Sequence, residues 1–216
     1  MNPYSHYLLA SKAAPLIQPD HLSEYYLGSI IPDIRYLAGI RREQTHLSRA
    51  RIQEYRSAYP HLASFLQGFQ VHCLIDEIDV AGVVSSAFPL NLLRLLRRVF
   101  SPQQITVLVE LYFMQSARMD WQIAENHNEV LTDLGITPTQ TQTYLAAMKE
   151  YLTSPSFETA LSCFQKIGWL KSSRSEKYLQ AYHSLERNRM LKGLLLMGVR
   201  NANLEKVVVN HVRSAI

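Results

Sequence analysis

The sequence predicts an all-α protein built as a multi-helix bundle, and three observations support this fold class. Apolar residues recur at helical spacing along much of the chain, β-branched runs are rare, and helix-capping patterns stand between the apolar segments. The 216 residues are 47% hydrophobic, which suits one domain with a large core. We therefore expect a single all-helical domain over residues 1–216.

Four helices and one loop-rich segment are expected in the first part of the chain. Gly28 predicts the end of a short helix, and Pro32 with Gly39 makes the next segment a loop with at most one helical turn. The expected helices span residues 3–17, 19–28, 46–59 and 60–84.

Capping patterns place the later helices. The run SPQQ at residues 101–104 is a capping box with proline at the first helical position, and TPTQ at residues 137–140 repeats it. The first box is expected to open a helix that reaches about Leu134. The run VVV is assigned to a helix rather than a strand. The other expected helices span residues 89–100, 154–168, 175–199 and 203–216.

Composition and charge narrow the classes of protein. The formal charge of +4, from 22 basic and 18 acidic residues, is too weak a bias to imply a nucleic-acid partner. Cys73 and Cys163 cannot form a disulfide framework; they suit a reducing compartment or serve as small apolar fillers of the core. No signal-peptide pattern begins the chain, and no apolar run reaches the ~18 residues of a transmembrane helix. We expect a cytoplasmic protein, and its oligomeric state is left open.

The segment QVHCLIDEID, residues 70–79, places polar chemistry on a helix that otherwise looks buried. His72 and Asp76 are four residues apart and therefore lie on one helical face, and Asp79 is expected on the same face. An unpaired carboxylate in a core costs several kcal/mol. Either this face is wet, or a positive group lies against it.

Further histidines and acids precede this segment. His6 lies on the first helix, Asp33 follows a proline, and His46 follows a threonine. Imidazole and carboxylate groups together are the ligands of zinc and similar divalent ions. A His and an Asp one helical turn apart suit one ion or a bridge between two. We therefore predict a divalent metal, with zinc preferred, held by His6, Asp33, His46, His72 and Asp76.

The order of these motifs resembles that of a known family. The runs YYLGSIIPDI, TH and GFQVHCLIDE are similar to those of zinc-dependent phospholipase C, a family related to the zinc-dependent single-strand nucleases. The resemblance covers about residues 3–80 and implies an all-helical fold of the phospholipase C type. The matching positions are Gly28, Pro32, Asp33, His46, Gly68, Phe69, His72 and Asp76, with His6 as the early helical histidine.

The chain also departs from the family pattern. Secreted members use an N-terminal Trp as a ligand, whereas this chain starts with Met1. A later helix of the family carries a His-x-x-x-Glu ligand pair that has no counterpart here, and Glu110, Asp120 or His127 could stand in for it. We therefore expect one or two metals rather than three.

The resemblance implies hydrolysis of a phosphoester, with a small phosphoester or lipid-like molecule as substrate. Two metals about 3.5–4 Å apart can share a hydroxide and clamp the oxygens of a phosphoester. In this mechanism Asp76 bridges the metals and acts with Asp33 in catalysis. Asp79 is expected to orient a ligating imidazole or a water molecule.

Two alternatives stay open. A nucleotide phosphohydrolase of the HD type also holds its metal with His and Asp on packed helices, although it carries adjacent His-Asp, whereas Cys73 follows His72 here. The other alternative is a non-catalytic helical binding protein with an incomplete metal site. The missing His-x-x-x-Glu pair would be explained by that reading.

Overall fold

The computed structural model describes residues 3–86, 121–154, 156–170, 172–187, 193 and 202–216, and these ranges contain no strand. The predicted all-α class is therefore confirmed. None of the helices in these ranges is both long and apolar enough to cross a bilayer. The elements are α1 (Pro3–Ile17), α2 (Leu22–Ile30), η1 (Ile31–Ile34), α3 (Arg35–Ala38), α4 (Arg42–Thr45), α5 (Arg49–Ala58), η2 (Pro60–Leu62), α6 (Ala63–Asp76), α7 (Val80–Ser86), α10 (Glu129–Asp133), α11 (Pro138–Thr153), α12 (Phe157–Lys166), α13 (Ser172–Arg187) and α15 (Leu204–Ala215).

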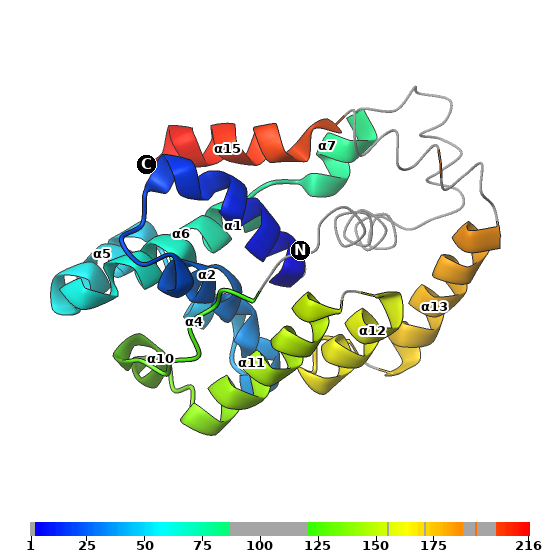
Figure 1. Cartoon of the computed structure of the whole chain (residues 1–216), viewed down its shortest axis with the longest axis horizontal. Coiled ribbons are helices and arrows are strands. Elements are labelled where there is room, and N and C mark those ends of the chain that lie inside the picture. The colour runs from blue at the N-terminus through cyan, green and yellow to red at the C-terminus, as the bar shows by residue number, and fades with distance from the viewer. Residues whose placement is uncertain (1–2, 87–120, 155, 171, 188–192, 194–201) are drawn as a thin grey trace.

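Helix α1 lies in the interior of the bundle. Every side chain from Pro3 to Ala10 is buried, and the helix contacts α2, α6, α11 and α15. A helix that is apolar and buried all round belongs inside a bundle rather than on its surface. In Figure 1, α15 lies along one side of α1, and α11 and α12 lie on the other. His6 is thereby placed in the core.

Helices α2 and α6 cross at two glycines. A Cβ atom at Gly28 would lie 2.0 Å from the carbonyl oxygen of Phe65, and one at Gly68 would lie 1.8 Å from that of Tyr25. Only glycine permits so close an approach between two backbones. The prediction that Gly28 ends its helix is wrong, because α2 continues to Ile30 and the glycine serves this crossing instead.

The segment between α2 and α5 is more helical than expected. It contains the 3-10 helix η1 and the short helices α3 and α4, and Gly39 ends α3 with φ at +68°. Pro32 fits the first turn of η1, where its missing N–H would have no intrahelical partner. The prediction of a loop with at most one turn is therefore wrong, and the short helices hold Asp33 and His46 in place.

The helix expected over residues 60–84 is divided into three elements. It comprises η2, then α6, which ends at Asp76, and then α7, which begins at Val80. Asp79 caps α7, because its Oδ1 accepts a hydrogen bond from the N–H of Gly82 at 3.0 Å. Since α6 has already ended, Asp79 does not continue the helical face of His72, and that prediction is wrong.

The capping box at residues 137–140 is confirmed as the start of α11. Thr137 Oγ1 accepts from the N–H of Gln140 at 3.2 Å, and Gln140 Oε1 accepts from the N–H of Thr137 at 2.8 Å. Gly168 follows α12 with φ at +73°, and residues 207–209 lie in α15, as predicted. The long helix expected to reach Leu134 is wrong at its end, because residues 121–128 are not helical. Its earlier part and the helix expected over 89–100 lie outside the described residues.

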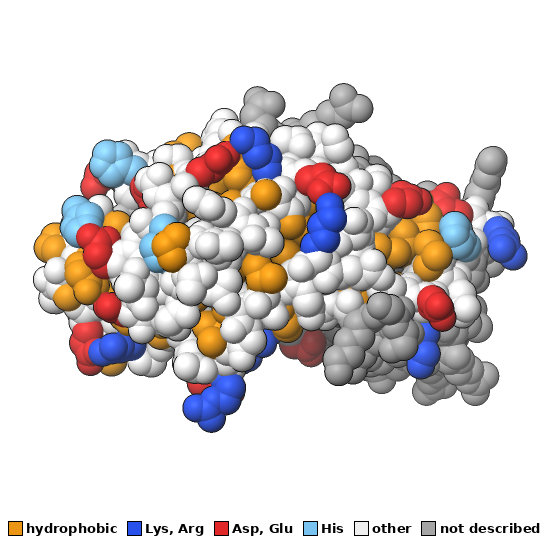
Figure 2. Space-filling view, turned by 90° about the horizontal axis from the view of Figure 1, so that it is seen from below, with side chains coloured by type: hydrophobic (Ala, Val, Ile, Leu, Met, Phe, Trp, Pro, Cys, Tyr) orange, Lys and Arg blue, Asp and Glu red, His pale blue; other side chains and the backbone are white. Residues whose placement is uncertain are grey.

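The face shown in Figure 2 carries charges of both signs. Acidic and basic side chains are interspersed there, with small apolar areas between them. Recognition of a nucleic-acid backbone depends on clustered Lys and Arg. The described side chains of this face form no extended basic surface of that kind.

Candidate metal centre

Five side chains predicted as ligands converge beside the last turn of α6. Asp76 Oδ1 lies 3.0 Å from His6 Nε2, and Asp76 Oδ2 lies 2.9 Å from His46 Nε2. The same Oδ2 lies 3.9 Å from His72 Nε2. Asp33 Oδ2 lies 3.7 Å from His6 Nδ1. The fold thus brings together residues from α1, η1, the end of α4, and α6.

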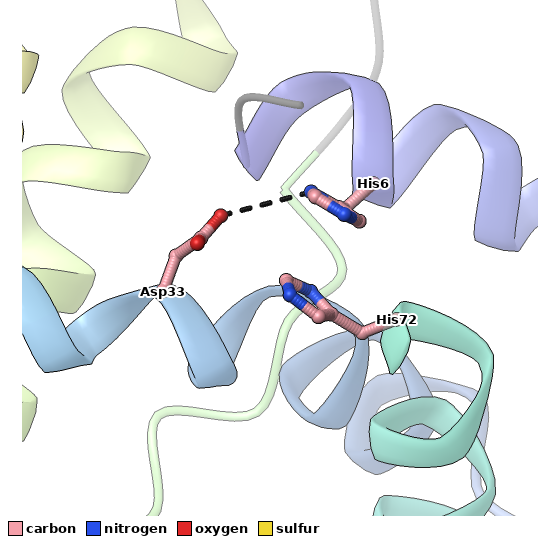
Figure 3. A group of neighbouring side chains, drawn as sticks. All are labelled: His6, Asp33 and His72. Atoms are coloured by element: carbon pink, nitrogen blue, oxygen red, sulfur yellow. Dashed lines mark ion pairs between the residues drawn. The ribbon is translucent and has the colours of Figure 1, made fainter. Parts of the chain in front are cut away.

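The five side chains form two overlapping groups. We call His6, Asp33 and His72 the inner group, shown in Figure 3, and His46, His72 and Asp76 the outer group. Within each group, ligand atoms lie within 4.8 Å of one another. Two ligand atoms of a tetrahedral zinc ion, each bound at ~2.0–2.2 Å, are about 3.4 Å apart. Each group would therefore have to contract to bind an ion.

The hydrogen bond made by His72 determines which of its nitrogens faces the group. Its Nδ1 lies 2.8 Å from the carbonyl oxygen of Ser29, and because a carbonyl only accepts, this nitrogen carries the proton. Burial, with an electrostatic contribution from nearby His6, holds the pKa of His72 well below its ordinary value. The ring is therefore neutral, and its Nε2 has a lone pair and no hydrogen-bond partner. A metal-ligating imidazole has this arrangement.

The crossing of α2 and α6 produces this orientation. Gly28 stands beside Ser29, and Gly68 lies one helical turn before His72. Close contact at the glycines brings the Ser29 carbonyl within reach of the imidazole. His72 also stacks on His6, with ring centroids 3.8 Å apart and planes inclined by 15°. Backbone packing and ring stacking therefore fix the rings of the inner group before any ion binds.

The two acids have opposite electrostatic environments. Burial raises the pKa of Asp33, although the neighbouring His6 opposes this, and its Oδ2 has no hydrogen-bond partner in the part of the chain that the structure describes. Burial alone would raise the pKa of Asp76 as well, but His6 and His46 lower it well below its ordinary value. Asp76 is thus an ionised carboxylate between two imidazoles, whereas the burial of Asp33 is only partly offset by His6, whose Nδ1 lies 3.7 Å from its Oδ2. A divalent ion would offset it further.

Sequence reasoning missed Arg42. Its Nη2 lies 2.9 Å from Asp76 Oδ2, and its side chain is 48% exposed, whereas that of Asp76 is 8% exposed. Arg42 precedes His46 by four residues, so helical spacing would have placed the two together. It provides the positive group that the face of His72 and Asp76 was expected to need.

The later part of the chain contacts the same region. Tyr144 of α11 donates a hydrogen bond from its hydroxyl to the carbonyl oxygen of Ile30, at 2.7 Å. Burial raises the pKa of Tyr144 well above its ordinary value, and nearby Asp33 adds to this, so the phenol remains a donor. The ring of Tyr36 lies 6.1 Å from that of Trp169. Residues beyond 120 therefore help to enclose the element that carries Asp33.

The remaining predicted residues lie elsewhere. Asp79 is engaged as the cap of α7, and its predicted role beside a ligand stays a prediction. Asp120 and Glu110 lie outside the described residues. His127 contacts the hydroxyls of Thr141 and Thr132, at 2.9 and 3.0 Å, and belongs to neither group.

Comparison of the chain with protein-family models, with curated proteins and with solved structures finds no match. The all-α class is shown by the fold itself. The resemblance to zinc-dependent phospholipase C, and the corresponding type of fold, stay predictions that rest on the motifs of residues 3–80.

Proposed function

We propose that this protein is a metal-dependent phosphoester hydrolase that binds one or two divalent ions in the inner and outer groups. One observation supports the metal above all others. Among the described residues, the buried Nε2 of His72 and the buried Oδ2 of Asp33 have no hydrogen-bond partner. Burying such atoms without a hydrogen bond is costly, and a cation would satisfy both. Imidazole with carboxylate suits zinc among the common divalent ions.

The geometry limits how two ions could share these residues, since His72 belongs to both groups and Asp76 lies between His6 and His46. His72 has one free lone pair, because its other nitrogen is bonded to Ser29, so it binds one ion at a time. Asp76 has both oxygens directed at imidazoles, Oδ1 toward His6 and Oδ2 toward His46. A carboxylate placed in this way is suited to bridge two ions. Asp76 is therefore the proposed bridging ligand.

The proposed reaction uses the outer group, which is the less buried of the two. A bound divalent ion would lower the pKa of a coordinated water to about 7 and polarise the phosphoester. His46 also lines a surface pocket of about 490 Å³, with Leu47, Tyr55 and the polar Ser48 among its walls. A small phosphoester or lipid-like substrate would approach the metal from this side. The buried carboxylate of Asp33 would help to hold the metal from the core side.

The burial of the inner group favours a second candidate function. His6 and His72 are fully buried, and Asp33 is 4% exposed. Structural metal sites are closed by protein ligands, whereas catalytic sites keep a position open for water or substrate. The second candidate is therefore a non-catalytic binding protein, in which a metal confined to the inner group would only stabilise the fold.

The substitution Asp76→Asn tests the proposed function, with Asp20→Asn at an exposed position as the matched control. We expect wild type and the control to contain metal and to hydrolyse bis(p-nitrophenyl) phosphate. We expect Asp76→Asn to lose metal affinity and activity by about 100-fold or more, because it loses a charged ligand. Elemental analysis and initial rates provide the measurements.

The outcomes separate the candidate functions. Wild-type protein that binds metal but hydrolyses neither nucleotides nor phospholipid analogues would support the non-catalytic binding protein. Preference for nucleotides within that panel would favour a hydrolase of the HD type. Wild-type protein purified without chelator that contains no divalent metal would contradict every metal-based candidate.

A further inference from the structure

We propose that Arg42 binds the phosphate of the substrate beside the outer group, and that in the metal-free protein the same side chain is held on Asp76. This inference rests on the proposed function, since it requires a metal-bound phosphoester at that group. It assigns a role to a residue that the metal centre itself does not use as a ligand.

Arg42 lies at the solvent-exposed edge of the outer group. Its Nη2 lies 2.9 Å from the oxygen of Asp76 that also lies 2.9 Å from His46 Nε2. Its side chain is 48% exposed, whereas those of His46 and Asp76 are 9% and 8% exposed. Arg42 is therefore the solvent-facing cation of the outer group. A molecule reaching Asp76 from the side of Arg42 meets the guanidinium first.

Arg42 and a metal ion in the outer group would compete for the carboxylate of Asp76. Asp76 is one of the residues that would hold an ion in the outer group, and it is the carboxylate to which Arg42 donates a hydrogen bond. Two cations on one carboxylate oxygen repel each other, and each weakens the interaction of the other. The exposed guanidinium is free to turn away, whereas the buried ligands are not. Metal binding is therefore expected to release Arg42 from Asp76.

Once released from Asp76, the guanidinium of Arg42 is suited to bind a phosphate. A guanidinium offers a planar fork of N–H donors that matches two oxygens of a phosphate, and it stays charged at any physiological pH. A phosphoester held by the metal would place its non-bridging oxygens next to the position that Arg42 leaves. The side chain would then exchange a carboxylate partner for a phosphate partner. Arg42 is thus a substrate-binding residue and not a ligand.

The test uses the full chain loaded with zinc and inorganic phosphate as the probe. Arg42→Ala removes the guanidinium, Arg42→Lys keeps the charge without the fork, and Arg49→Ala removes a different exposed arginine from the start of α5. Titration calorimetry gives the phosphate affinity, and competition with a chromogenic chelator gives the zinc affinity. Neither readout depends on turnover.

We expect Arg42→Ala to weaken phosphate binding at least about tenfold, since a charge-assisted hydrogen bond is lost, and Arg42→Lys to restore part of it. Zinc affinity should be equal to wild type or higher, because a competing cation is gone. A loss of phosphate affinity no greater than that of Arg49→Ala overturns the inference. Reduced zinc affinity in Arg42→Ala also overturns it, because Arg42 would then only support the ligands. Wild-type protein that binds no zinc instead contradicts the proposed function itself.

Discussion

The inner and outer groups differ in how the chain builds them. The inner group comes from the core: α1 is buried all round its first half, and the crossing of α2 and α6 fixes His72. The outer group takes His46 from the end of a four-residue helix and is joined by an exposed arginine. The two groups share one imidazole.

This difference separates two requirements of a metal site. Ligands on packed helices are held rigidly, which favours tight binding, whereas residues on short connecting elements give access to solvent and substrate. If the proposed function holds, the inner group would supply the rigid geometry for metal binding, and the outer group would supply access for solvent and substrate. Three substitutions test whether this division is correct.

Gly68→Ala is expected to have the largest effect. The added methyl would lie 1.8 Å from the backbone oxygen of Tyr25, and backbone moves less readily than a side chain. We expect a loss of about 3 kcal/mol in the free energy of unfolding, measured with urea. Gly39→Ala is the control: it has no neighbour within 4 Å, and only its φ of +68° is unfavourable, costing about 1 kcal/mol. Equal losses in both variants would mean that the helix crossing does not hold the inner group.

Asp33→Asn is expected to stabilise the metal-free protein at neutral pH. Burial raises the pKa of Asp33 in the folded state above its unfolded value of about 3.9. The protonated acid therefore contributes stability below about pH 3.9, and this stability is lost as the pH rises through the folded-state pKa. Asparagine does not ionise, so the variant keeps its stability over the same range. Its advantage over wild type in the presence of EDTA should therefore grow from pH 4 to pH 7, measured by urea unfolding.

The same variant should lose the stabilisation that metal gives to wild type, because a ligand is missing. Asp20→Asn, at an exposed position, should show neither effect. An advantage of Asp33→Asn that shrinks as the pH rises would show that the inner acid does not carry the cost of burial assigned to it.

Asp79→Ala is expected to have the smallest effect. It removes the cap of α7 and should cost about 1 kcal/mol, while the metal content stays unchanged. Thermal unfolding and elemental analysis give the two values. A tenfold loss of metal affinity would instead support the role beside a ligand that the sequence suggested, and would extend the outer group beyond α6.

The sequence predicted the five residues of the candidate centre from local spacing and from the order of motifs. The spacing of His72 and Asp76 needs only helical geometry, and His6, Asp33 and His46 follow from their ligand chemistry together with the motif order that resembles zinc-dependent phospholipase C. Capping boxes such as TPTQ at residues 137–140 are equally local.

The errors came from contacts between distant segments. Gly28 was interpreted as the end of a helix because the sequence near it does not show that α6 packs against this position. The end of α6 at Asp76 is marked by no proline or glycine in the next three residues, and the local sign of a new helix is Asp79, which caps α7. Arg42 belongs to a run of charged residues, and its partner Asp76 is 34 positions away in the sequence.

The hydrogen bond from Tyr144 to the Ile30 carbonyl bears on any attempt to excise the site. All five proposed ligands fall between residues 6 and 76, so a fragment ending near residue 86 would be enough to transplant them into a smaller scaffold if only those residues mattered. Such a fragment would leave the Ile30 carbonyl, which directly precedes η1, without its phenolic donor. The smallest portable version of this centre must therefore include α11 or a designed substitute for it.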